Sequence, residues 1–80
     1  MPKFRKKPVV IDAVQAKEGG MALLPGVYRD SDRQAWVIRT LEGVMEVKPG
    51  DWVITGIKGE HYPCRDDIFR ATYELVEDGS

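Results

Sequence analysis

The sequence predicts a mainly β fold: a small, strongly bent antiparallel sheet or partial barrel with one or two short helical turns. Short runs of β-branched and aromatic residues, such as Trp52-Val53-Ile54-Thr55, favour extended strands. Glycine and proline pairs at Gly19-Gly20, Pro25-Gly26 and Pro49-Gly50 separate these runs, and such pairs mark turns. With 80 residues and no internal repeat, residues 1–80 are expected to form a single domain.

The N-terminal part is expected to contain one long strand and then an irregular segment. From Phe4 to Ala16 both faces of the strand are largely apolar, which is typical of a strand covered on both sides. Residues 17–34 are rich in turn residues and are compatible with either helix or loop. Within them, Met21 to Leu24 suffices for one helical turn, and Val27-Tyr28 suits a short strand.

A hairpin is predicted in the middle of the chain. Its strands run from Ala35 to Leu41 and from Val44 to Lys48, on either side of a tight turn at Glu42-Gly43. Met45 and Val47 alternate with charged residues, so one face of the second strand should be buried.

The stretch around Trp52 is expected to add a third strand to this hairpin. A strand from Asp51 to Ile57 would follow the turn at Pro49-Gly50, so that three consecutive strands form a meander. Lys58-Gly59 is predicted as the tip of a further hairpin. Its return strand would start at Glu60-His61-Tyr62 and end at Pro63, because proline lacks the N–H that a strand ladder needs.

The C-terminal part is expected to contain a helical turn and a last strand. Asp66-Asp67 would cap a turn that continues through Ile68-Phe69. The strand would run from Arg70 to Val76, with alternate residues on one side. Residues 1–3 and 77–80 should fray.

Charge and hydropathy exclude several function classes. Lys and Arg number 12, Asp and Glu 13, and the net charge is −1, which argues against a nucleic-acid-binding protein without sequence preference. The longest apolar run is far below the ~20 residues of a membrane-spanning helix, so no membrane contact is expected.

Cys64 and His61 are the only cysteine and the only histidine. No intrachain disulfide can form, and one residue of each type cannot build a closed zinc site. Residues three apart in a strand point to opposite faces, so the two cannot act together as nucleophile and base. Small domains often need extra support, and a homo-oligomer is therefore expected here. The lone thiol favours a reducing cytoplasm.

The sequence carries no pattern typical of an enzyme. The adjacent carboxylates of Asp66 and Asp67 do not converge on one point, and helix capping accounts for them. Residues 56–60 place a lysine between glycines but lack the Gly-Lys-Ser/Thr ending of a phosphate loop. We therefore predict no catalytic residue, no metal and no cofactor.

Aromatic and basic residues instead indicate recognition of a polar, aromatic small molecule. Trp52 or Tyr62 would stack on a planar ring. Four cations would hold phosphates: Arg5, Lys7, Lys58 and Arg65. A chain this small cannot enclose such a ligand alone, so the pocket is expected between subunits.

Two stretches of the sequence, FRKKPVVIDAVQ and TLEGVMEVKPGDWVITGIKGEHYPCRDDIFRATYE, resemble a widespread class of short bacteriophage and prophage accessory proteins. Residues 17–34 depart from that pattern, because they are brief where members of the class often carry a longer helical insert. The resemblance implies a phage protein acting in the cytoplasm of the bacterial host. It implies no particular biochemical activity.

Three functions are compatible with these features. By analogy with other small phage proteins, the chain would be a non-enzymatic counter-defence protein. It would sequester a nucleotide-derived immune signal of the host in a pocket formed on oligomerisation. The alternative is a protein–protein interaction or structural module that binds a host or virion protein through a sheet edge. An enzyme acting on a nucleotide is a third and weaker reading.

Overall fold

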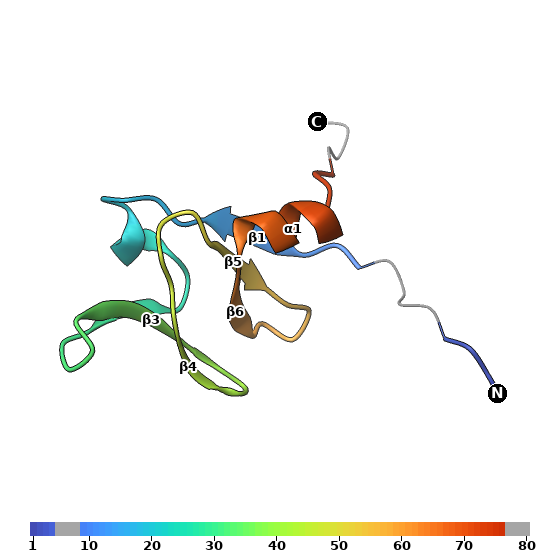
Figure 1. Ribbon diagram of the computed structural model, residues 1–80, viewed down its shortest axis with the longest axis horizontal. Coiled ribbons are helices and arrows are strands. Elements are labelled where there is room, and N and C mark those ends of the chain that lie inside the picture. The colour runs from blue at the N-terminus through green and yellow to red at the C-terminus, as the bar shows by residue number, and fades with distance from the viewer. Residues whose placement is uncertain (5–8, 77–80) are drawn as a thin grey trace.

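Six strands form two three-stranded antiparallel sheets in the computed structural model, which describes residues 1–4 and 9–76 (Figure 1). One sheet has the order β1-β5-β6, and its strands are β1 (Asp12–Gln15), β5 (Trp52–Thr55) and β6 (His61–Cys64). The other has the order β2-β3-β4, with β2 (Val27–Asp30), β3 (Ala35–Thr40) and β4 (Gly43–Glu46). The expected mainly β, antiparallel fold is confirmed, and the described strands do not close into a barrel.

The segment 17–34 contains the helical turn and the short strand that its sequence favours. The 3-10 helix η1 spans Met21–Leu23, and β2 starts at Val27 as predicted but continues to Asp30. Between them Gly26 has a positive φ of 74°, and a Cβ at this position would lie 2.9 Å from the His61 ring. Glycine therefore lets this turn pass close to β6.

The first strand is shorter than predicted. Of the expected Phe4–Ala16 strand, residues 5–8 lie outside the described residues, and only Asp12–Gln15 pair with β5. The paired part of β5 has four residues, Trp52 to Thr55, and one further hydrogen bond beyond them joins the Ala16 amide to the Asp51 carbonyl at 2.7 Å. Burial of both faces, which was expected for this first strand, occurs instead in β3 and β5. Val37 and Ile38 in β3 are consecutive residues and both are buried, and the same holds for Val53 and Ile54 in β5.

The predicted meander is wrong, because β4 and β5 belong to different sheets. The connection between them changes partner within a few residues. The Val47 amide donates to the Trp36 carbonyl at 2.8 Å, which extends the β3–β4 ladder. Gly50, with φ 98°, then donates to the Ala16 carbonyl at 2.8 Å, and the chain enters the other sheet. The Pro49-Gly50 turn thus joins two sheets instead of two neighbouring strands.

Pro63 does not end its strand. It lies inside β6 and pairs with Val53. β6 is an edge strand, and an edge tolerates the missing N–H when it faces away from the ladder.

The expected C-terminal strand Arg70–Val76 is also wrong, because the α-helix α1 spans Asp66–Thr72 and residues 73–76 form no strand. Phe69 and Tyr73 are four residues apart, which places them together on one side of a helix, and their rings lie 5.1 Å apart. The alternation that suggested a strand is too short to distinguish the two-residue period of a strand from the 3.6-residue period of an α-helix.

The core lies between the two sheets and η1. Val27 and Trp36 pack against its six buried members, which are Ala16, Met21, Leu24, Ile38, Val47 and Val53. Of the predicted buried face of the hairpin, Val47 is buried but Met45 is exposed. No helix in the part of the chain that the structure describes is long and apolar enough to cross a membrane.

Replacing Ile38 by valine should lower the free energy of unfolding by about 0.5–1.5 kcal/mol, because it removes a methylene from a fully buried site. Urea unfolding followed by tryptophan fluorescence measures this. The control is Leu23→Ala, at a side chain that is 89% exposed, for which a change below about 0.5 kcal/mol is expected. Equal losses for both variants would contradict the core assignment.

Candidate functional site

The tips of two hairpins enclose a groove of about 540 Å³, which we call the hairpin groove. The β3–β4 hairpin supplies one wall and the segment from the β5–β6 turn to β6 supplies the other. The lining residues are Thr40, Leu41, Glu42, Met45, Ile57, Lys58, Glu60, His61, Tyr62 and Pro63. The groove thus combines large apolar side chains with a few polar ones, as small-molecule sites do.

Charge in the hairpin groove is mixed. Lys58 is the one lysine or arginine among its lining residues, and Glu42 and Glu60 are its carboxylates. Leu41 and Ile57 are exposed apolar side chains of the two walls. This set suits a flat molecule with a single anionic group and a polar edge better than a polyphosphate, which the two carboxylates would repel.

Tyr62 gives the groove a neutral hydroxyl. Burial, followed by a hydrogen bond with Tyr73 and by the nearby Glu60 carboxylate, raises the pKa of Tyr62 to about 12. A tyrosine hydroxyl is neutral at physiological pH in any case, and burial of Tyr62 makes its anion still less favourable. Its ring remains a face on which a planar ligand can stack.

His61 is tied to its neighbouring strand. Its Nδ1 lies 3.0 Å from the Thr55 hydroxyl, opposite it in the β5–β6 ladder. This contact occupies one of the two ring nitrogens of His61. Cys64 is half-buried, and burial raises the pKa of its thiol, so the thiolate that a nucleophile needs is disfavoured.

Trp52 lies away from the hairpin groove and holds the helix. Its ring stacks on Phe69 with centroids 4.1 Å apart and an angle of 9° between the planes. Its Nε1 donates to Asp66 Oδ1 at 2.9 Å.

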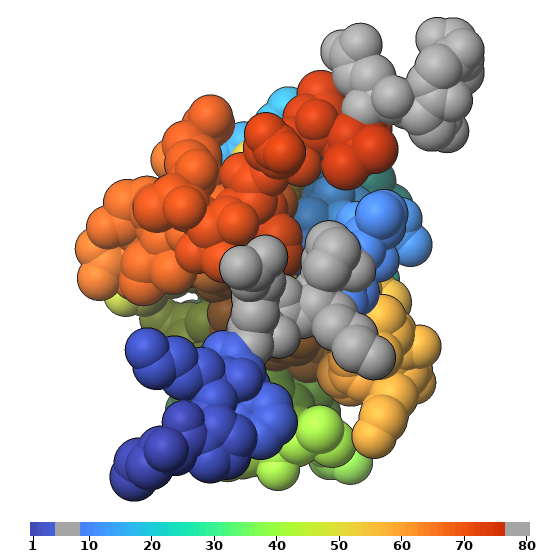
Figure 2. Space-filling model, turned by 90° about the vertical axis from the view of Figure 1, so that its right-hand side faces the viewer, coloured from blue at the N-terminus to red at the C-terminus, as the bar shows by residue number. Residues whose placement is uncertain are grey.

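Trp52 also borders a second groove of about 680 Å³, the helix groove, between residues 9–13 and residues 69–76. Figure 2 shows this face, where the red C-terminal segment adjoins the blue residues that lead into β1.

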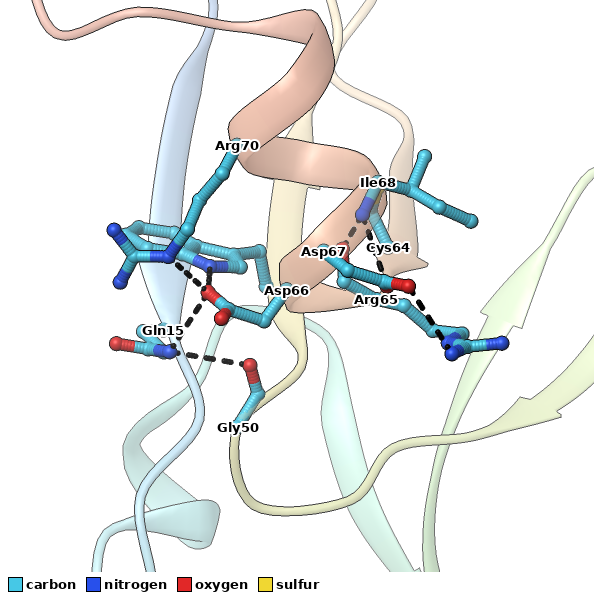
Figure 3. A network of polar contacts seen from close by, with 9 residues as sticks. Gln15, Gly50, Cys64, Arg65, Asp66, Asp67, Ile68 and Arg70 are labelled. Carbon is cyan, nitrogen blue, oxygen red and sulfur yellow. Dashed lines mark hydrogen bonds and ion pairs between the residues drawn. The ribbon is translucent and has the colours of Figure 1, made fainter.

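The Asp66 carboxylate joins β1, β5 and α1. Besides Trp52, its Oδ1 accepts hydrogen bonds from Gln15 Nε2 at 3.3 Å and from Arg70 Nε at 2.8 Å. Figure 3 shows Gln15 and Arg70 pointing toward Asp66. The hydrogen bond from Trp52, followed by the hydrogen bond and the charge of the Arg70 guanidinium, holds the pKa of Asp66 below its usual value. Asp66 has no capping role: Arg65 is the N-cap and its side chain makes no capping hydrogen bond, whereas Asp67 Oδ1 accepts from the Ile68 amide in the first turn at 2.9 Å.

The predicted ligand-binding residues that the structure describes do not all meet in one site. Lys58 and Tyr62 line the hairpin groove together. Trp52 borders the helix groove, and Arg65 lines neither groove but pairs with Asp67 at 3.2 Å. Arg5 and Lys7 lie outside the described residues.

The sequence did not indicate that Leu41 and Met45 contribute to the site. They come from the hairpin 39–46, and only the packing of one hairpin across another brings them near Lys58. The role of Asp66 was also missed, although Asp66 and Arg70 have the i, i+4 spacing of a helical ion pair.

Within residues 1–4 and 9–76 no group of three or more His, Cys, Asp or Glu side chains could hold a metal ion. Comparison of the chain with models of known protein families, with curated proteins and with solved structures finds no match.

Replacing Asp66 by asparagine should lower the melting temperature at pH 7. It should also make the decrease in melting temperature at acidic pH smaller than in the wild type. The folded-state pKa of Asp66 is depressed, so its stabilisation is present above the usual aspartate pKa and is lost as pH falls through the depressed value. Thermal unfolding between pH 7 and pH 2.5 measures both effects. In Asp67→Asn, which removes only an exposed pair with Arg65, the acid-induced fall should match the wild type. Matching acid profiles for Asp66→Asn and the wild type would contradict this assignment.

Proposed function

We propose that this protein is a non-enzymatic binding protein that captures a nucleotide-derived small molecule in the hairpin groove. The observation that carries this proposal is the meeting of Lys58 and Tyr62 with the apolar side chains of the facing hairpin in one groove. Lysine can hold one phosphate, and tyrosine and the apolar wall can pack on a base.

The charge of the groove narrows the ligand class. One lysine among two glutamates favours a nucleotide with one phosphate per groove, such as half of a cyclic dinucleotide, over a triphosphate. Glu42 and Glu60 are acceptors suited to the amino and ring N–H groups of a base.

The resemblance to short phage and prophage proteins supports a cellular role for this binding. In the cytoplasm of an infected bacterium, removal of a nucleotide-derived immune signal would block the host response. Sequestration requires affinity but no chemistry, which fits a groove whose histidine is already hydrogen-bonded to Thr55.

The alternative function is binding of a host or virion protein through a sheet edge. It is favoured by β4, an edge strand whose four residues are all exposed. Extended peptides add to such edges through backbone hydrogen bonds. A pull-down from infected cells that yields one stoichiometric protein partner, with no nucleotide bound, would support this function instead.

The proposal predicts that a nucleotide ligand raises the melting temperature. Thermal shift against cyclic dinucleotides, cyclic trinucleotides and cyclic ADP-ribose isomers should find at least one compound that stabilises the fold, by ~2.7 kcal/mol at a hundredfold excess over Kd. Lys58→Ala and Tyr62→Ala should each weaken that binding at least ~10-fold, since each removes a direct contact.

Lys17→Ala is the matched control, because Lys17 is exposed and lines neither groove. It should bind like the wild type. Chromatography of the nucleotides after incubation should show no product. Absence of any stabilising compound, or equal weakening by Lys17→Ala, would contradict the proposal.

A further inference from the structure

The outer edge of β4 is open. β4 is the last strand of its sheet and pairs only with β3 among the described strands. Its four residues are exposed, with Val44 at 37% and Met45 at 42%. The β3–β4 hairpin forms the lower end of the folded body in Figure 1. An exposed edge with apolar side chains is a template for pairing with another strand.

The hydrogen-bond pattern shows which backbone groups this edge offers. The Val47 amide donates to Trp36 at 2.8 Å, so Val47 faces β3. Successive residues in an antiparallel ladder alternate, which directs the N–H and C=O groups of Val44 and Glu46 to the open side. The Lys48 amide agrees with this alternation, because it donates to Asp51 Oδ2 at 3.0 Å and not to β3.

We propose that β4 pairs antiparallel with β4 of a second copy, around a two-fold axis at Met45. Val44 of each copy then exchanges backbone hydrogen bonds with Glu46 of the other. The two Met45 residues form a non-hydrogen-bonded pair, in which side chains approach most closely. The result is a continuous six-stranded sheet.

Charge complementarity selects this register over its two neighbours. An axis at Val44 would set Glu42 opposite Glu46 of the second copy, and an axis at Glu46 would set the two Glu46 carboxylates against each other. Like charges directly opposite are unfavourable. The axis at Met45 instead brings Glu42, in the turn before β4, toward Lys48 of the second copy, which follows its β4, twice by symmetry. Within one chain, Lys48 Nζ already lies 3.7 Å from Glu46 Oε2. Positive and negative side chains would therefore alternate across the interface between the two copies.

The pairing completes the proposed binding site. Met45 lines the hairpin groove, so Met45 of the second copy comes to the border of the same groove. Two grooves, each with one Lys58 and one Tyr62, then adjoin across the two-fold axis. This consequence rests on the proposed function, whereas the pairing itself does not.

Cysteine cross-linking tests the register. In a Cys64→Ser background, Met45→Cys places two thiols at the axis, within the ~4.4–6.8 Å Cα separation that a disulfide needs. Mild oxidation should convert most of this variant to a covalent dimer. Val44→Cys is the matched control on the same exposed strand. Its copies would be diagonal neighbours beyond ~7 Å, and at least ~10-fold slower cross-linking is expected.

Charge exchange tests the same register without cysteine. By sedimentation equilibrium, Glu42→Lys and Lys48→Glu should each weaken dimerisation about 5- to 30-fold, because two symmetric pairs become repulsive. The double variant E42K/K48E should recover affinity to within about threefold. Circular dichroism checks that every variant is folded.

The outcomes separate this inference from the proposed function. A wild-type chain that stays monomeric up to about 1 mM, or equal cross-linking at positions 44 and 45, would overturn the inference. A monomer that still binds a nucleotide would overturn it and leave the proposed function standing. A dimer in this register that binds no nucleotide would support the inference and contradict the proposed function.

Discussion

The contact of Trp52 with α1 holds the C-terminal part of the protein on the sheet of β1, β5 and β6. The indole stacks on Phe69 and donates a hydrogen bond to Asp66, so one side chain supplies both an apolar and a polar contact. Gln15 and Arg70 add donors to the same carboxylate oxygen. A helix of seven residues is too short to be stable by itself, and its position therefore depends on these tertiary contacts.

The contact between Trp52 and α1 also affects the wall of the hairpin groove that β6 forms. Only Arg65 separates β6 from α1, so the place of the helix fixes the end of β6. Tyr73, the C-cap of α1, packs on Phe69 and lies close enough to Tyr62 to contribute to its raised pKa. The end of the helix therefore lies beside a side chain that lines the groove. The opposite wall belongs to the other sheet, and its outer strand offers the free edge through which we infer a second copy completes the site.

Local patterns predicted the fold class and most of the elements but not their assembly. Turn residues and β-branched runs located η1, β2 and both hairpins, because these depend on neighbours in the chain. One of the two partners of β5 is β1, which lies far away in the sequence, and no local signal carries that pairing. Trp52 or Tyr62 was predicted to stack on a ligand, whereas the Trp52 ring stacks on Phe69, which had been predicted in a short helical turn. Of the predicted site, Lys58 and Tyr62 meet because they flank one hairpin tip.

The pH dependence of the two indole N–H resonances tests the central contact most directly. The Trp52 indole proton donates to Asp66, so its chemical shift should change with a midpoint below the usual aspartate pKa of 3.8. Trp36, which lies in β3 and forms no part of this contact, should show no such transition and serves as the internal control. A Trp52 resonance that stays as constant as that of Trp36 while the protein remains folded would contradict the account.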